Sequence, residues 1–457
     1  MTRPALRPRF RSILTLTLLA LPPTRLALAA IALGLVACAP GADSPAARAA
    51  ATPPAPVKWT TRAVPEARGD VRTLPDGKRE AVRYRGWTTE DFGRYRTYAY
   101  DDSRAEPAVT TVAAMPKIAG DPRIGRRLFL DRSRGPCTGC HLIRGEDVWP
   151  AGNVGPDLSS IGERGLPDAH LFEMIHDPRR LFPHTTMPPW GAQGVFSPVE
   201  VAHLVSFLQS QKGPLPVEKS AERDPATRTR PTGFGDNLDP TNNPAVGRAE
   251  AAEALWGRRG TAGKSCADCH AGGPLQAMRG VATRYPRHVA QYGRVLSIED
   301  LLAVHGPERA GLPLPAESPD NLDLAMLVKM ASNGMPVQLD LDGPEQRAAL
   351  ARGRAAFGKR VGQRNHACAD CHTQGKGADK FLGGRLLADV EVGLTRHFPT
   401  WRTSQGDVWD MRKRMQWCMT PLGMNMLAAD AVEYAELELY LASFDQGKPI
   451  SVPGIRH

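Results

Sequence analysis

Three short motifs of the form C-x-x-C-H most constrain what this chain can fold into. They are C-T-G-C-H at residues 137–141, C-A-D-C-H at 266–270 and C-A-D-C-H at 368–372. In such a motif two thiols form thioether bonds to a haem, and the adjacent histidine is placed as an axial ligand of the iron. With eight cysteines and twelve histidines among 457 residues, roughly four random chains in a thousand would carry even one such motif. The sequence therefore predicts three covalently bound haem c groups.

Two other uses of paired cysteines fit the pattern less well. A zinc ribbon needs two C-x-x-C pairs close together and has no use for the histidine, and a thioredoxin-like site needs only one pair. We therefore expect haem attachment and proximal ligation by Cys137, Cys140, His141, Cys266, Cys269, His270, Cys368, Cys371 and His372.

The first 37 residues have the pattern of a targeting segment. Five arginines precede an apolar run of twelve residues at 26–37, which is too short to span a membrane as a helix. The run ends in Leu35-Val36-Ala37-Cys38 and so resembles a bacterial lipoprotein signal, in which the cysteine is lipidated and becomes the new amino terminus. We expect a periplasmic protein with a lipid anchor at Cys38; ordinary cleavage into the periplasm is the alternative.

The basic charge of the chain belongs partly to this segment. Because five arginines leave with the signal, the formal net charge of +10 falls to +5 in the mature protein. No block of lysine or arginine and no nucleic-acid motif is found in the mature part, so we expect no nucleic-acid partner. A mildly basic surface still suits small anionic substrates.

The rest of the chain divides by composition. Residues 38–115 begin with an Ala/Pro-rich tether, and their later part, 58–110, is charged, without a sustained period, and is expected to be extended or partly ordered with no assigned role. Residues 213–235 are rich in Pro, Gly and charge and predict an interdomain linker.

The remaining segments predict an all-α fold. Apolar residues recur at spacings of three and four, as at 199–208 and 433–442, and sustained strand alternation is absent. We expect three class-I-like cytochrome c domains at 116–212, 236–343 and 344–457. The second and third motifs lie 102 residues apart, which indicates a tandem duplication of the last two domains.

Each haem needs a second axial ligand or an open position. For the first haem the best candidate is Met187, in the sequence H-T-T-M-P-P-W-G. Two prolines follow it and hold the backbone extended, so that the thioether can be presented at a fixed place. A methionine is more often part of a core than a ligand, and the haem motif is what favours ligation here.

One cysteine, Cys418, is left after the lipobox and the haem motifs are assigned. If its segment is helical, Arg414 lies four residues before it on the same face, where a positive charge favours the thiolate. A thiolate is both an iron ligand and a nucleophile. The alternative is an inert buried thiol.

Residues 116–212 resemble SoxX and residues 236–457 resemble SoxA, the cytochromes of bacterial thiosulfate oxidation, here joined in one chain. The SoxX-like part carries C-T-G-C-H, N-V-G-P-D-L-S-S-I-G, H-D-P-R and T-M-P-P-W-G. The SoxA-like part carries L-W-G-R-R-G-T-A-G-K-S-C-A-D-C-H, G-V-A-T-R-Y-P, S-N-G-M-P, H-A-C-A-D-C-H, F-P-T-W-R, L-E-L-Y-L-A and P-I-S-V-P-G-I-R.

This resemblance implies an enzyme of the L-cysteine S-thiosulfotransferase type. The family attaches thiosulfate oxidatively to a cysteine of a carrier protein, SoxYZ. It implies that Cys418 is the distal ligand of the active haem, opposite His372, and can carry an extra sulfur, with Arg414 beside it. The W-C-M-T-P-L sequence around Cys418 departs from the usual family pattern, so the packing over the active haem is left open.

A second departure concerns the haem of the second motif. The family usually supplies a distal cysteine, and this chain has His305 at that place. Imidazole is a competent ligand, so we expect His270 and His305 to ligate this haem, with His288 and Met335 as competitors.

Joining thiosulfate to a thiol releases two electrons, while a haem accepts one at a time, so two haems must share them. Methionine ligation raises the haem potential and thiolate ligation should lower it, so electrons should pass from the third haem to the first and then to a small acceptor cytochrome c. Two alternatives remain open: a thiosulfate dehydrogenase that forms tetrathionate, and a membrane-tethered multihaem electron shuttle.

Overall fold

The computed structural model describes most of the chain beyond residue 115 and three strands before it. The described residues are 66–73, 79–86, 98–100, 109, 115–117, 119–132, 134–217, 220–230, 242–361, 365–419, 422, 424 and 429–456. The expected signal segment and Cys38 lie outside these ranges. Among the residues within them, we find no helix that is long and apolar enough to cross a membrane.

Three strands lie in the segment that was expected to be extended or partly ordered. They are β1 (Glu66–Thr73), β2 (Arg79–Gly86) and β3 (Tyr98–Tyr100), which form an antiparallel sheet in that order. No residue of this sheet was predicted to belong to a site.

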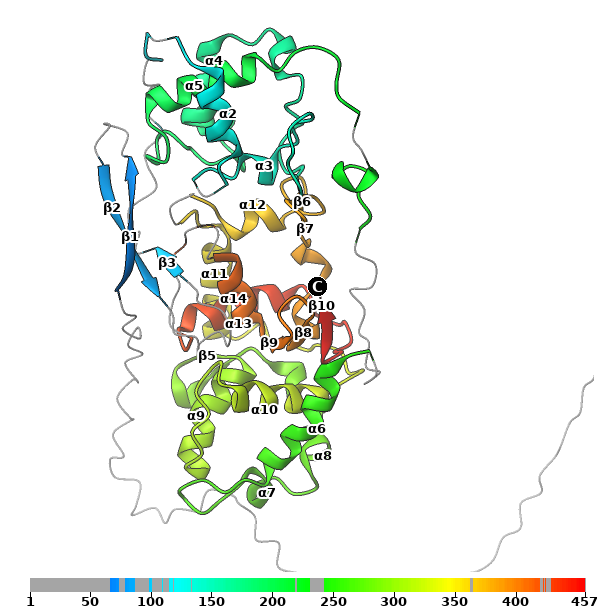
Figure 1. Cartoon of the computed structure of the whole chain (residues 1–457). Helices are drawn as coiled ribbons and strands as arrows, with labels where there is room; N and C mark the ends of the chain where they lie inside the picture. Colours follow the sequence, from blue (N-terminus) through cyan, green and yellow to red (C-terminus); the bar gives the residue numbers. More distant parts are fainter. Residues whose placement is uncertain are drawn as a thin grey trace, which may run out of the picture. The chain divides into compact units, whose positions relative to one another are not determined.

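The first helical group surrounds the first motif and consists of α2 (Pro122–Leu130), α4 (Asp168–His176) and α5 (Pro198–Gln209). Figure 1 shows these helices close together. The predicted helix at 199–208 is confirmed as α5. Helices α2 and α5 approach so closely that a Cβ on Gly125 would lie 1.9 Å from the carbonyl oxygen of His203. The core between them is apolar and includes Phe129, Phe172, Phe196, Leu204 and Phe207.

The second helical group surrounds the second motif. Its longer helices are α6 (Pro244–Trp256), α9 (Ile298–Ala310) and α10 (Pro319–Met330). The remaining elements are the short helix α8 (Pro274–Ala277) and the antiparallel pair β4 (Arg287–Val289) and β5 (Arg294–Leu296). Ser297 directly precedes helix α9, and its side chain and that of Asp300 form a capping box.

The third helical group surrounds the third motif. Its helices are α11 (Pro344–Gly358), α13 (Met411–Met419) and α14 (Val432–Ser443), and α14 confirms the helix predicted at 433–442. Two small sheets complete the group. One is the hairpin β6 (Phe381–Leu382) and β7 (Arg385–Leu386). In the other, β8 (Thr400–Arg402) pairs antiparallel with β9 (Asp407–Trp409) and parallel with β10 (Gly454–Arg456).

The second and third groups share one hydrophobic core. Its buried members come from both predicted domains and include Ala245, Ala249, Val295, Met326, Val408, Ala435 and Leu439. Residues on both sides of position 343, the predicted domain boundary, therefore contribute to one core, while the second group has smaller clusters of its own.

The fold is mostly helical, but the all-α expectation needs correction because strands also occur. They lie in the segment before the first helical group and in the second and third groups. Except for β1 and β2, which have eight residues each, these strands have two or three residues, which is too short to leave an alternating pattern in the sequence. Single 3₁₀ turns lie at Ile161–Arg164, Pro178–Arg180, Ala221–Arg223, Ala282–Arg284, Ala290–Tyr292, Val390–Val392 and Thr395–His397.

Part of the predicted linker carries specific contacts. Arg228 is only 8% exposed. It donates from Nη1 to the carbonyl oxygen of Gly383 at 2.8 Å and from Nη2 to that of Ala151 at 3.0 Å. Its guanidinium also lies over the rings of Trp149 and Phe381. This arginine therefore joins the β6–β7 hairpin to the first helical group.

Candidate active site

Each C-x-x-C-H motif occupies one helical turn. The turns are α3 (Cys137–Cys140), α7 (Cys266–Cys269) and α12 (Cys368–His372). The backbone N–H of His141 donates to Cys137 O at 2.8 Å, and the N–H of His270 donates to Cys266 O at 2.9 Å. One turn places the two thiols of a pair near each other with the histidine directly behind them, as attachment of one haem requires.

The histidines of the first and third motifs are both oriented by a backbone carbonyl. The Nδ1 of His141 lies 2.8 Å from the carbonyl oxygen of Pro156, and the Nδ1 of His372 lies 2.7 Å from that of Ala388. Because a carbonyl only accepts, Nδ1 carries the proton and Nε2 has a lone pair for a metal. Burial also lowers the pKa of His141, which favours the neutral ring.

The N-V-G-P sequence at residues 153–156 passes directly beside the ring of His141. A Cβ on Gly155 would lie 2.3 Å from the ring of His141. Only glycine therefore lets the chain pass beside the imidazole while Pro156 supplies the acceptor for Nδ1.

The first and third motifs open onto one cavity of about 2190 Å³. Pockets for a single small ligand usually measure about 300–1,000 Å³, so this cavity has room for more than one large group. Among the described residues, the second motif contributes nothing to its wall. The predicted ligands that line it are Cys137, Cys140, His141, Met187, Cys368, Cys371, His372 and Cys418.

The cavity wall fits an apolar group that carries carboxylates. Its wall is largely apolar and includes the side chains of Phe129, Leu171 and Trp190. Arg360 also lines it, and the buried Nη1 of this arginine has no hydrogen-bond partner within the described residues. Such a donor suits the carboxylate of a haem, and the paired thiols and lone-pair imidazoles suit its attachment and ligation.

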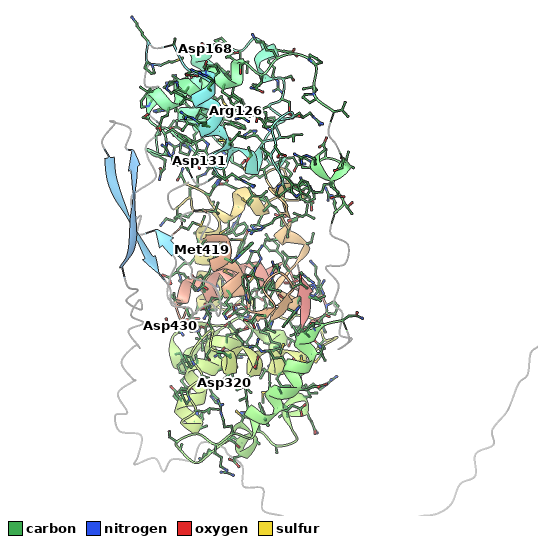
Figure 2. The ribbon with its side chains drawn as sticks, in the orientation of Figure 1. Arg126, Asp131, Asp168, Asp320, Met419 and Asp430 are labelled. Carbon is green, nitrogen blue, oxygen red and sulfur yellow. The ribbon has the colours of Figure 1, made fainter. Side chains whose placement is uncertain are left out.

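Cys418 lies on α13 with its sulfur held by a guanidinium. Arg414 Nη1 donates to Cys418 Sγ at 2.6 Å, which confirms that the two residues share one helix face. Burial raises the pKa of Cys418, but the lowering effects, of which the charge of Arg414 is the largest, outweigh burial and bring this pKa to about 6. The position of Cys418 can be found in Figure 2 from the label of Met419, the next residue, which ends α13. The thiol is therefore placed as a thiolate facing the histidine of the third motif.

Further arginines gather near this thiol, and the sequence analysis gave them no role. Arg402 and Arg456 lie directly opposite each other on the paired strands β8 and β10, an arrangement that costs free energy for like charges. Burial and the charge of Arg414 lower the pKa of Arg402 to about 10, and its buried Nε has no hydrogen-bond partner within the described residues. An anion in the cavity would relieve this repulsion.

Trp417 lies near two guanidinium groups, that of Arg385 and that of Arg414. The Arg385 guanidinium carbon lies 3.5 Å from the centre of the Trp417 ring, and that of Arg414 lies 5.2 Å from it. Arg385 comes from the β6–β7 hairpin, so it reaches the active site from a segment about thirty residues earlier in the chain. Trp417, which was expected to depart from the usual family pattern, lines the same cavity as Cys418.

The second motif has a different partner. The rings of His270 and His305 have centroids 6.3 Å apart. A metal–imidazole bond of about 2.0–2.1 Å and a ring built from bonds of about 1.33 Å would place the centroids of two rings on one metal about 6.3 Å apart. Burial lowers the pKa of both histidines, which favours their neutral, ligating forms. This separation agrees with ligation of one iron by both rings.

The two competitors for the second haem lie in other surroundings. His288 sits on β4, where its backbone N–H donates to Gln346 Oε1 at 2.6 Å. Met335 packs beside Gly280. Of the three candidates, His305 is the one whose ring contact with His270 the structure describes.

The chain is similar to known cytochrome c proteins. The SoxA/TsdA cytochrome c domain family matches residues 251–337 and 352–450, and the family of cbb3-type cytochrome c oxidase subunit III matches residues 120–208. The SoxA subunit of L-cysteine S-thiosulfotransferase from Rhodovulum sulfidophilum is 31% identical over 223 residues, which are 48% of this chain and 75% of that protein. This chain belongs to the SoxA family.

Other SoxA proteins show the same relationship. The SoxA subunit from Pseudaminobacter salicylatoxidans is 29% identical over 217 residues, which are 47% of this chain and 73% of that protein. The crystal structure of SoxXA from P. pantotrophus shares 28% identity, covers 48% of this chain and 80% of that chain, and has a TM-score of 0.44. Membership in the SoxA family, with a further cytochrome c match at residues 120–208, confirms that the chain is a cytochrome with covalently bound haem c.

Proposed function

We propose that this SoxA-family chain attaches thiosulfate oxidatively to the cysteine of a SoxYZ-type carrier protein, with Cys418 as the reacting thiol. The observation that carries this proposal is the 2.6 Å contact between Arg414 Nη1 and Cys418 Sγ, at the wall of a cavity shared with the third motif. The enzyme type expected from the sequence, L-cysteine S-thiosulfotransferase, is confirmed by the relatives that carry this name.

Three haems would be held by residues that the sequence predicts. Each haem supplies one-electron oxidation and reduction, so two of them are needed for a two-electron step. The ligand sets are Cys137, Cys140, His141 and Met187 for the first; Cys266, Cys269, His270 and His305 for the second; and Cys368, Cys371, His372 and Cys418 for the third.

The chain's own groups prepare the reaction. Arg414 holds Cys418 as a thiolate, which is the nucleophilic form of the side chain. Arg402 and Arg385 add positive charge beside it, and this charge favours entry of the thiosulfate dianion. The apolar walls of the cavity keep water away from the reacting sulfurs and so strengthen these charge interactions.

The sulfur chemistry balances when Cys418 carries the substrate transiently. The Cys418 thiolate and thiosulfate form a sulfur–sulfur bond, and two electrons leave. A thiolate of the carrier then attacks the sulfur next to Cys418, which releases the Cys418 thiolate and leaves the thiosulfate group on the carrier. The net change is loss of one proton from the carrier thiol and of two electrons.

The ligands set the direction in which these electrons leave. A thiolate such as Cys418 favours the oxidised state of its site, and a methionine such as Met187 favours the reduced state. Because both residues line one cavity, electrons have a short route from the Cys418 site to the Met187 site. A small acceptor cytochrome c would take them from there.

The proposal includes the arrangement of the whole chain. Residues 116–212 would act as a fused SoxX-like electron acceptor, and the fusion keeps it at high effective concentration next to the SoxA-like part. The protein would lie in the periplasm, attached to a membrane through a lipid on Cys38.

The direct test is thiosulfate-dependent reduction of the haems in the presence of the carrier. Cys418→Ala should abolish this reduction, whereas the control His288→Ala, which changes a histidine on β4, should leave it intact. A Cys418→Ala protein that reduces its haems at the full rate would contradict the proposal.

Product analysis separates the alternatives. Tetrathionate formed without carrier would identify a thiosulfate dehydrogenase. For an electron shuttle, mass spectrometry of the peptide that contains Cys418 would show the thiol unmodified after exposure to thiosulfate. The proposed enzyme should need the carrier and should show added sulfur on Cys418.

A further inference from the structure

Arg360 joins the third motif to the loop that carries Met187. It lies just beyond the end of α11, and its Nη2 donates to Asp370 Oδ1 at 3.2 Å and also to the carbonyl oxygen of Thr185. Asp370 is the third residue of C-A-D-C-H, and Thr185 lies two residues before Met187. One guanidinium nitrogen therefore bonds to parts of two predicted haem sites.

The Met187 loop has internal hydrogen bonds that connect this carbonyl to the methionine. The N–H of Thr185 donates to Phe182 O at 3.0 Å, and the N–H of Met187 donates to Thr185 Oγ1 at 3.1 Å. Pro188 and Pro189 follow and restrict the backbone. Because residues 185–187 are held together in this way, a bond that fixes the Thr185 carbonyl also fixes the start of the Met187 side chain.

The other end of the bridge is anchored firmly. The Asp370 side chain is 1% exposed, and its Oδ2 accepts from the backbone N–H of Ala367 at 3.0 Å within the third motif. Lys376 Nζ lies 3.2 Å from the same Oδ1 that Arg360 contacts. Asp370 is thus a rigid point from which Arg360 extends to the first helical group.

We propose that Arg360 is a positioning residue for Met187, through which the SoxA-like part of the chain holds the distal-ligand loop of the first haem. The proposal rests on the proposed role of Met187 as that ligand. It makes methionine ligation in the first site dependent on a side chain from the third helical group. Arg360 itself makes no contact with Met187 that the structure describes, so its action is through the loop.

The test compares Arg360→Gln with Lys376→Gln in the full-length, haem-loaded protein. Both variants remove one cation at 3.2 Å from Asp370 Oδ1, but only Arg360→Gln removes the bond to the Met187 loop. Near-infrared magnetic circular dichroism distinguishes His/Met, bis-His and His/Cys ligation. We expect Arg360→Gln to lose part of the His/Met signal and Lys376→Gln to keep it.

A second measurement detects a loosened ligand directly. Added imidazole should displace Met187 about tenfold more readily in Arg360→Gln than in the native protein, as expected for loss of one charge-assisted hydrogen bond. Arg360→Lys keeps a charge beside Asp370, but its nitrogen is one bond nearer the backbone than Nη2 and should not reach both acceptors at once. It should show the same weakening if Arg360→Gln does not fold.

The outcomes separate this inference from the proposed function. A native protein without a His/Met signal would show that Met187 is not the ligand. A native signal that persists in Arg360→Gln and Arg360→Lys, with unchanged imidazole binding, would overturn the inference alone. Equal loss of the signal in Lys376→Gln would also overturn it, because the charge at Asp370 would then be responsible rather than the bridge.

Discussion

The chain contains the sequence C-A-D-C-H twice, and the two copies lie in opposite surroundings. In the second motif the Asp268 side chain is 35% exposed and pairs with Arg259 at 3.1 Å. In the third motif the Asp370 side chain is 1% exposed and lies 3.2 Å from both Arg360 and Lys376. Both aspartates accept a hydrogen bond from the backbone at the start of their turn, so the local structure is the same and the environment differs.

The distal partner differs in the same way. His270 lies beside His305, whose pKa is lowered by burial, whereas His372 lies beside Cys418, whose pKa is lowered to about 6, against the effect of burial, chiefly by the charge of Arg414. The third motif also shares a cavity with the first motif. The pentapeptide therefore accounts only for the attachment of haem. Residues distant in the sequence determine whether the site also contains a nucleophilic thiol and positive charge that can bind an anion.

The largest expected difference between the two sites concerns the arginine beside each. Arg414→Gln should lower kcat/KM for thiosulfate by about 10²–10³-fold, because it removes a charged donor from the reacting sulfur. Arg259→Gln removes the arginine beside Asp268 and should leave this value unchanged. Steady-state reduction of an acceptor cytochrome measures both, and equal effects would show that the arginines act only through overall charge.

Stability should distinguish the two aspartates. Asp370→Asn should lower the free energy of unfolding by about 3 kcal/mol, because the Asp370 carboxylate is 1% exposed and is the counter-charge of both Arg360 and Lys376. Asp268→Asn should leave it unchanged, because its ion pair is exposed to solvent. Asparagine keeps a side-chain acceptor for the cap in both variants, so the comparison isolates the charge.

Asp370 should also make the stability of the fold depend on pH. The pKa of Asp370 is lowered to about 2 by His366, the Ala367 N–H and Arg360, against the effect of burial. Since the unfolded value is about 4, this carboxylate stabilises the fold above pH 4, and that stability is lost as the pH falls toward 2. Denaturant titrations between pH 5 and 2 should show a smaller loss in Asp370→Asn than in the native protein.

Local parts of this picture could be predicted from the sequence. The helices at 199–208 and 433–442, and the shared face of Arg414 and Cys418, depend only on helical periodicity over one or two turns. These features are fixed by neighbours in the sequence, and the structure confirms them.

Other parts depend on contacts between distant segments. Arg385 and Arg402 reach the thiol through the short β6–β7 hairpin and the β8–β10 pairing, and strands of two or three residues leave no pattern. The shared core of the second and third groups was missed for a similar reason, because apolar periodicity shows that a helix face is buried but not which helix covers it.

The distal ligand proposed for the haem of the second motif, His305, can be tested by spectroscopy. His305→Met should convert a bis-His signal in near-infrared magnetic circular dichroism to a His/Met signal, while turnover of thiosulfate changes little because this site lies outside the shared cavity. His288→Ala and Met335→Leu are the matched controls and should leave the spectrum unchanged. A change in either control, with none in His305→Met, would assign the ligand differently.

The last expected effect concerns the pH dependence of stability at Glu317. This residue is buried and accepts a hydrogen bond from Gln416 Nε2 of α13 at 2.7 Å. Burial, together with the nearby Asp410, raises the pKa of Glu317 to about 8. Because the folded protein holds this proton between pH 4.5 and 8 while the unfolded chain does not, Glu317 lowers stability progressively as the pH rises through that range.

Glu317→Gln should therefore flatten this part of the pH profile. At pH 5 the variant and the native protein should unfold at similar denaturant concentrations, and at pH 8 the variant should be more stable by about 3 kcal/mol. The matched control is Glu345→Gln, on the exposed first turn of α11, which should keep the native slope. If Glu317→Gln keeps that slope as well, the residue is ionised throughout, and the cations Arg412 and Lys413 near it compensate fully for its burial.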